Sequence, residues 1–229
     1  MLRPKKKITK KEMKEDALIS TYVKVTSFYE QYKRTISIAI TAVVVVVIAT
    51  VVFFKNRADN NERAFQQVGE IHQFFDNGQY QAAIDGIPER NVVGLASIVD
   101  NYGSTTAGNL ARFYLANAYF QLGKFDEALE MFEKYSPGDD ALAASRYAGI
   151  AGCQEVKGNY AEAGRNFEKA ASAYKNESSV AENLNSAARN LALAGDKEKA
   201  VEVYKRLKKN HPTTTYGRDA DRHIAQLSV

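Results

Sequence analysis

Hydrophobic and polar residues follow three different patterns along the 229-residue chain. The first is an apolar run at residues 35–54, TISIAITAVVVVVIATVVFF, which contains no charged side chain. A helix of about 20 residues rises roughly 30 Å, which matches the hydrocarbon core of a bilayer, and strands are seldom this long. The run therefore predicts a transmembrane helix, with Tyr32, Phe53 and Phe54 where interfacial aromatic residues belong.

The residues around this run distinguish a retained anchor from a cleaved signal peptide. A signal peptide has an apolar stretch of roughly 7–15 residues behind a short basic segment. Here 34 residues precede a longer run, and the following VVFFKNR has no small-x-small cleavage site. We therefore expect an uncleaved anchor.

The second pattern precedes the apolar run and has the period of an amphipathic helix. Its apolar residues recur every three or four positions and form a candidate membrane-partner face: Leu18, Tyr22, Val25, Tyr29 and Tyr32. Residues at this spacing share one side of a helix. Two alternatives could contact this face: the lipid headgroups of the inner leaflet, or the cytoplasmic end of another membrane protein.

The third pattern follows the apolar run and repeats. In YFQLGKFDEALEMFEKY, Gly123 interrupts an otherwise amphipathic helix, which predicts a turn between two helices because glycine inside a helix costs about 1 kcal/mol relative to alanine. Gly123, Phe125, Ala128 and Phe132 are matched 35 residues later by Gly158, Tyr160, Ala163 and Phe167, and 37 residues after that by Gly195, Ala200 and Tyr204. A weaker copy at Gly78 lies 45 residues before Gly123, so an insertion is expected after the first copy.

These positions resemble the tetratricopeptide repeat (TPR). The best copy matches the family pattern at Leu115, Ala116, Tyr119, Gly123, Phe125, Ala128 and Phe132, and Pro212 closes the last copy. The tryptophan that is frequent in the first helix is absent, and Arg112 stands in its place. The resemblance implies helix pairs that stack into an α-solenoid with a concave and a convex side.

The predicted fold class is all-α, with a single N-terminal transmembrane helix, a TPR-like α-solenoid of about three to four helix-turn-helix repeats, and a C-terminal capping helix. The predicted divisions are 1–34 as a basic cytoplasmic segment with an amphipathic helix, 35–54 as the transmembrane helix, and 55–229 as a periplasmic TPR domain. Within that domain we expect repeats at about 61–90, 109–142, 144–177 and 181–214, and a cap at 215–229.

Charge is distributed unevenly about the apolar run. Residues 1–34 hold ten Lys and Arg against four Asp and Glu, a balance of +6, whereas the remaining residues hold 21 against 23, a balance of −2. By the positive-inside rule the N-terminus is expected in the cytoplasm and the C-terminal domain on the other side, as in a single-pass protein of the bacterial inner membrane. The basic RPKKKITKK then serves as a topology signal and a contact with anionic lipid, and no nucleic-acid partner is expected.

The sequence contains no motif that is typical of a catalytic site. Cys153 is the only cysteine and is expected to be buried and inert, and His72, His211 and His223 are scattered without metal-ligand spacing. The sequence contains no GxSxG motif, P-loop or dinucleotide fingerprint. We therefore expect neither an enzyme nor a cofactor, metal or small-molecule substrate.

Binding of protein partners is the remaining function, and solenoids offer an extended concave surface for it. The TPR resemblance implies that the first helix of each repeat lines that surface, which nominates Phe113, Asn117, Phe120, Gln121, Glu155, Asn185 and Arg189. The aromatic members have an alternative role as interhelical core. TPR domains that grip the C-terminal carboxylate of cytosolic chaperones use Lys and Asn at positions that here carry Phe113, Ala148 and Asn185, which argues against that ligand.

The order of a basic helix, one anchor and a TPR domain resembles the ancillary subunit family of the SecYEG translocon, whose members are similar to the TPR domain of the cell-division coordinator. That resemblance implies a place beside the protein-export channel, with the solenoid contacting periplasmic chaperones or emerging substrates. Two other classes remain open: a scaffold in another envelope complex, such as division, motility or outer-membrane assembly, and an adaptor or enzyme regulator unconnected with export.

Overall fold

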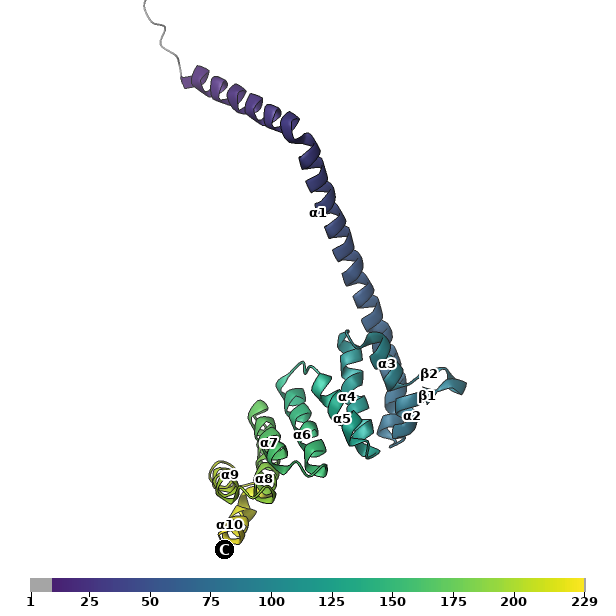
Figure 1. Ribbon diagram of the computed structural model, residues 1–229, viewed down its shortest axis with the longest axis vertical. Coiled ribbons are helices and arrows are strands. Elements are labelled where there is room, and N and C mark those ends of the chain that lie inside the picture. Colours follow the sequence, from purple (N-terminus) through teal and green to yellow (C-terminus); the bar gives the residue numbers. More distant parts are fainter. Residues whose placement is uncertain (1–9, 229) are drawn as a thin grey trace, which may run out of the picture. The chain divides into compact units, whose positions relative to one another are not determined.

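The computed structural model describes the backbone of residues 10–228 and side chains from residue 19 onward (Figure 1). The chain divides into two compact units, residues 1–56 and 57–229. Helix α1, Lys10–Asp76, contains the predicted amphipathic segment, the apolar run and the first repeat helix within one stretch of 67 residues. No proline occurs in this stretch, and Gly69 is its only glycine, so nothing in the sequence ends the helix earlier.

The apolar run inside α1 is exposed within its own unit. The valines from Val43 to Val47 are each 49–63% exposed, and none of the most apolar window of the helix is buried. A core helix of a soluble protein would be covered by other elements. Among the described residues, this is the one helix long and apolar enough to cross a membrane, as the uncharged run predicts.

The second unit is built mainly from helix pairs that follow one another along the chain. Three regular pairs are α4 (Thr106–Gln121) with α5 (Phe125–Lys134), α6 (Asp140–Val156) with α7 (Tyr160–Ala173), and α8 (Glu177–Leu193) with α9 (Lys197–Asn210). Helix α10 (Thr215–Leu227) follows and packs against α9 and α8. Each helix packs against the next, which is the arrangement of an α-solenoid and confirms the all-α fold (Figure 1).

The start of the solenoid is less regular. The end of α1 is followed by the short helix α2 (Tyr80–Asp85), and then by strand β1 (Gly86–Ile87), the 3-10 turn η1 (Pro88–Arg90) and strand β2 (Val92–Val93). The strands pair antiparallel, with Gly86 opposite Val93. Helix α3 (Leu95–Tyr102) then packs against α2 and α4. The insertion inferred from the 45-residue spacing is thus a small hairpin and an extra helix.

The glycine turns between paired helices share one geometry. Gly78, Gly123, Gly158 and Gly195 all have positive φ, between 73° and 87°, a region that side chains other than glycine adopt at a cost. At the second turn the Gly123 N–H donates to the Phe120 carbonyl at 3.0 Å and the Lys124 N–H to the Tyr119 carbonyl at 2.9 Å. The other three turns repeat both bonds, which is a Schellman ending of each first helix.

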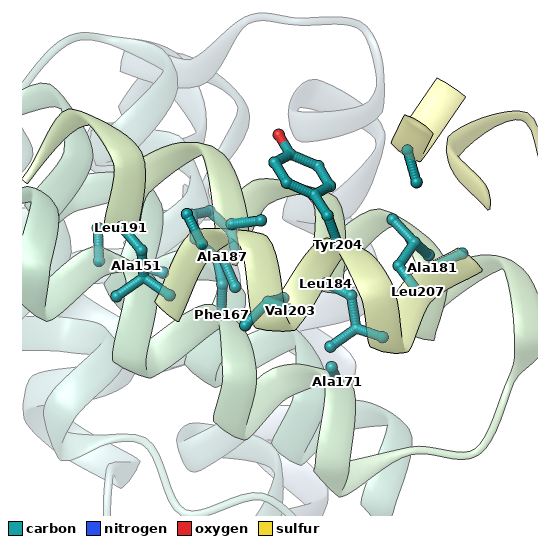
Figure 2. Packing of buried hydrophobic residues seen from close by; sticks show 14 residues of the cluster. Ala151, Phe167, Ala171, Ala181, Leu184, Ala187, Leu191, Val203, Tyr204 and Leu207 are labelled. Carbon is teal, nitrogen blue, oxygen red and sulfur yellow. The ribbon is translucent and has the colours of Figure 1, made fainter. Parts of the chain in front are cut away.

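The repeated offsets within the chain place small and aromatic side chains between the helices. The alanines five positions after each glycine, Ala83, Ala128, Ala163 and Ala200, are fully buried, and Phe132, Phe167 and Tyr204 are buried one turn later. The largest hydrophobic cluster joins α6 through α10 and packs Phe167, Leu184 and Val203 close together (Figure 2). These are the contacts that the repeat pattern predicts.

Candidate protein-binding face

The predicted binding residues lie on α4, α6 and α8, the first helices of the three regular pairs. Helix α4 contacts α6, and α8 contacts α10. Side chains from α6 and α8 also bond to each other. We call the side on which α4, α6, α8 and α10 meet one another the first-helix face, and each meeting of two such helices a junction.

The two predicted aromatic residues pack mainly inside the solenoid. Phe113 is half-buried and lies against Tyr135 and Phe132, with ring centroids 5.1 and 6.0 Å apart. Phe120 lies edge-on to Phe125 at 5.3 Å. Both rings are half-buried and pack against a core cluster that includes Phe132 and Ile150, so they contribute to the interhelical core.

The predicted amides make no hydrogen bond between helices among those that the structure gives, and one of them is exposed. Gln121 is exposed, and Asn117 and Asn185 are half-buried. The Asn117 side-chain amide donates to the carbonyl of Phe113 at 2.8 Å, within its own helix. A partner could reach these amides without breaking a contact between helices.

The two predicted charged residues, Glu155 and Arg189, bind each other. The Arg189 guanidinium lies 2.8 Å from one Glu155 carboxylate oxygen and 3.0 Å from the other. The buried Asn190 amide also donates to Glu155 at 2.9 Å. The carboxylate thus connects α6 to α8, and because the pair is partly exposed its contribution to stability is modest.

Sequence reasoning missed Asn190. Counting from the glycine turns, it occupies the position of Ala118 and Cys153, which are both fully buried. A polar residue at an otherwise apolar repeat position indicates a partner across the interface, so the register itself could have revealed it.

The junctions follow one rule in the repeat register. At a filled junction, a side chain near the end of one first helix contacts a residue on the first helix of the next pair. The first residue lies three positions before its own glycine turn, and the second lies six positions before the following glycine turn. At the α4–α6 junction, the Phe120 ring lies 3.3 Å from where a Cβ on Gly152 would stand. At the α6–α8 junction, Glu155 reaches Arg189. At the α8–α10 junction, the first position is Ala192, which is half-buried and packs against the hydrophobic cluster that joins α6 through α10.

A hollow of about 320 Å³ lies at this third junction. It is lined by Arg189, Ala192, Leu193, Tyr204, His223, Gln226 and Leu227. The Tyr204 and His223 rings stack with centroids 4.9 Å apart and planes 14° apart. Burial raises the pKa of the Tyr204 phenol, with Arg189 acting in the opposite direction, so the hydroxyl stays neutral at physiological pH.

The remaining candidates for chemistry are structural. Cys153 is fully buried, and burial raises the pKa of its thiol to about 11, so the thiolate that reacts is scarce. His72 lies edge-on to Tyr114, with its Nδ1 atom 2.9 Å from Asp76. Within the described residues, no group of three or more His, Cys, Asp or Glu side chains could hold a metal ion.

The N-terminal candidate face is exposed where its side chains are described. Tyr22, Val25, Tyr29 and Tyr32 are exposed, whereas the Leu18 side chain lies outside the described residues. Ile19, Val23 and Phe28 are exposed as well. The Thr26 hydroxyl bonds back to the Tyr22 carbonyl at 2.9 Å. The apolar surface is therefore broader than the one stripe that the periodicity predicts.

Comparisons with known proteins agree with this architecture. The family model described as Tetratricopeptide repeat matches residues 110–136 and 186–214, within the predicted second and fourth repeats. A crystal structure of a Podosopora anserina putative kinesin light chain with nearly identical TPR-like repeats is similar, with a TM-score of 0.54 and 18% identity over 73% of this chain and 86% of that chain. A crystal structure of a variant of the same protein gives the same values over 85% of its chain. No curated protein matches.

These findings identify the class of protein: an all-α protein with tetratricopeptide repeats stacked in a TPR-like solenoid. Repeats of this kind are generally protein-interaction modules rather than catalytic centres. At 18% identity, the similarity to the solved structures establishes the fold.

Proposed function

We propose that this chain is a membrane-anchored, non-catalytic interaction protein that works beside the protein-export translocon of a bacterial inner membrane. The observation that carries the proposal is the helix α1, in which an uncovered apolar run continues into the first helix of a TPR-like solenoid. A protein built in this way tethers a binding surface to the bilayer.

The charge distribution supports a cytoplasmic N-terminus and a periplasmic solenoid. The balance is +6 before the apolar run and −2 from residue 35 onward. Positive segments resist transfer across the inner membrane, whereas the solenoid carries no such excess. In the periplasm, chaperones and emerging export substrates are the protein partners within reach.

The two ends have different roles in this proposal. The N-terminal helix, together with the anchor, contacts a membrane partner through the broad apolar surface that is described for residues 19–32. Lipid headgroups are the competing partner for this surface. The first-helix face contacts the periplasmic partner. Among its candidates, Asn117, Gln121 and Asn185 take no part in a bond between helices that the structure gives, so they suit a test better than Arg189, which holds Glu155.

Co-purification from detergent-solubilised membranes tests the proposal. The unmodified chain is expected to recover translocon subunits. The double variant Tyr22→Asn with Val25→Asn is expected to lose these subunits. The double variant Asn117→Ala with Gln121→Ala is expected to keep the translocon subunits and to lose periplasmic proteins. Recovery of division or motility proteins would instead indicate an envelope scaffold, and recovery of a soluble enzyme an adaptor. If both double variants behave alike, the N-terminal segment is only a topology signal and the two-ended proposal is wrong.

A further inference from the structure

The N-terminal part of α1 repeats its apolar positions with the period of a coiled coil. Positions 18, 22, 25, 29 and 32 lie alternately four and three residues apart, which is a mean spacing of 3.5 residues. The α-helix itself has 3.6 residues per turn, and a spacing of 3.5 keeps one line of side chains against a second helix that coils around the first. The spacing therefore indicates a helix as the partner of this face.

The same alternation continues into the apolar run. The next positions are all uncharged: Ile36, Ala39, Val43, Val46, Thr50 and Phe53. The following one is Arg57, where the line ends. We call the positions from 18 to 53 on this line the seam. The seam lies within a single unbroken helix, so a partner helix can follow it along its whole length.

The charges of the N-terminal segment avoid the seam. Residues 18–34 contain four charged side chains, and none of them occupies a seam position. Lys33 is the one that directly flanks the seam in a heptad register, and its ammonium lies 3.0 Å from the Glu30 carboxylate of the same helix. Two identical helices thus meet there with an internally paired charge, so their like charges do not keep them apart.

The uncovered area shows how long the contact must be. The aromatic side chains at and beside the seam, Tyr22, Phe28, Tyr29 and Tyr32, are 42–71% exposed. They offer roughly 450 Å², at about 200 Å² for a whole aromatic side chain. A stable interface buries about 800 Å² on each partner, so this segment alone is too small. The seam residues of the apolar run supply the remaining surface, since helices in lipid associate through close packing.

The continuity of α1 argues against lipid headgroups as the cover. A helix that rests among headgroups lies in the plane of the membrane, whereas a spanning helix crosses that plane. A sharp turn between the two usually needs a proline, a glycine or a bulge. Residues 18–54 contain neither proline nor glycine, and α1 is helical throughout this range. A second helix alongside α1 covers the seam without any such turn.

We infer that a second copy of this chain covers the seam, and that the two α1 helices run parallel as a coiled coil from about residue 18 to residue 53. They run parallel because two copies of one chain insert into the membrane in the same orientation. The inference goes beyond the proposed function, since the pair forms without any other protein. The membrane partner then contacts the paired helices, where Val23 is exposed outside the seam. Tyr22 and Val25 hold the pair together.

Disulfide formation between introduced cysteines tests the inference in native membranes that contain the full chain with two different affinity tags. Three variants place a thiol on the seam: Tyr22→Cys, Val25→Cys and Tyr29→Cys. Three variants place a thiol on the other side of the helix: Lys24→Cys, Ser27→Cys and Gln31→Cys. The resident Cys153 is fully buried, so the unmodified chain gives the baseline. After mild oxidation, the product that carries both tags is expected to be at least fivefold more abundant for the seam variants.

A matched pair of charge variants tests whether the seam itself holds the copies together. In the Tyr22→Cys background, Tyr29→Lys places a charge on the seam and Gln31→Lys places one outside it. Tyr29→Lys is expected to lower the yield of the doubly tagged product at least fivefold, and Gln31→Lys to change it by less than twofold. Alkaline extraction of the membranes checks that both variants stay inserted.

Three results would overturn the inference. Equal yields on and off the seam would indicate random encounters between copies. The absence of any disulfide-linked product would indicate that lipid covers the seam. A product in which the second tag is never found would indicate that a different membrane protein covers it. Equal effects of Tyr29→Lys and Gln31→Lys would also contradict the seam, even if the copies do associate.

Discussion

Two stretches of the same helix differ in how they use apolar side chains. In α1, residues 43–54 are a continuous apolar run whose large side chains are about half to two-thirds exposed, whereas Ala64, Val68 and Ile71 recur every three or four positions and are at most 6% exposed. A continuous run presents apolar atoms on all sides and suits a solvent that is itself apolar, such as lipid. A periodic pattern presents one stripe and suits neighbouring helices.

The largest effect is expected from charging the continuous run. Val45→Arg together with Val47→Arg should cost about 5–7 kcal/mol of insertion free energy, from roughly 2.5–3.5 kcal/mol for each arginine at a bilayer centre. Alkaline extraction of membranes should then release the chain, whereas the control Val45→Leu with Val47→Leu should stay bound. Continued membrane binding of the arginine variant would mean that residues 35–54 are not the anchor.

The next largest effect is expected from emptying the solenoid core. Phe132 is 2% exposed, and Phe132→Ala should lower the free energy of unfolding by about 3–5 kcal/mol because it leaves a cavity. Phe65 is 67% exposed, and Phe65→Ala should change it by less than about 0.5 kcal/mol. Cys153 offers the readout, because this single buried cysteine should react with a maleimide only after the solenoid unfolds in urea. Similar midpoints for the two variants would contradict the burial pattern.

Overpacking a helix contact should have a smaller effect. Ala163 is fully buried between helices, whereas Ala161 lies exposed on the same helix. Ala163→Leu should cost about 1–3 kcal/mol and Ala161→Leu almost nothing. Cys153 alkylation in urea again measures the difference. If the Ala163→Leu variant has the same urea midpoint of unfolding as the unmodified protein, the repeat register assigned to α7 is wrong.

The smallest expected effect concerns the turns. Gly123 has a φ of +75°, so Gly123→Ala should cost about 1–2 kcal/mol through backbone strain alone, since no atom lies closer than 4.0 Å to the added Cβ. Gly138 is also surrounded by open space but lacks a positive φ. Gly138→Ala should therefore be neutral or slightly stabilising. The urea midpoint of unfolding should be higher for Gly138→Ala than for Gly123→Ala.

Much of the solenoid could be predicted because its local rules repeat. The glycine spacing identified the turns, and the alanine and aromatic offsets identified the buried contacts. The hairpin at residues 86–93 could not be found in this way, because two strands of two residues each have no periodicity to detect. The continuity of α1 was missed for another reason. Three different environments were interpreted as three elements, although no helix-breaking residue separates them.

The binding face was predicted less completely than the fold. Position in the repeat indicates which side of the solenoid a residue occupies, but whether its side chain stays accessible depends on residues in the next repeat. Phe120 is covered because Gly152 leaves room for it, and Arg189 is held because Glu155 is long enough to reach it. Such pairs lie 32 to 34 residues apart in the sequence, and only the fold brings them together.

The central claim is that one chain places its basic N-terminus and its TPR-like solenoid on opposite sides of a bacterial inner membrane. Fusing a reporter enzyme that is active only outside the cytoplasm after residue 229 tests that claim most directly, with the same reporter placed before residue 1 as the control. The account predicts activity from the C-terminal fusion and none from the N-terminal one. Activity from the N-terminal fusion alone would contradict the topology, and with it the periplasmic role proposed for the first-helix face.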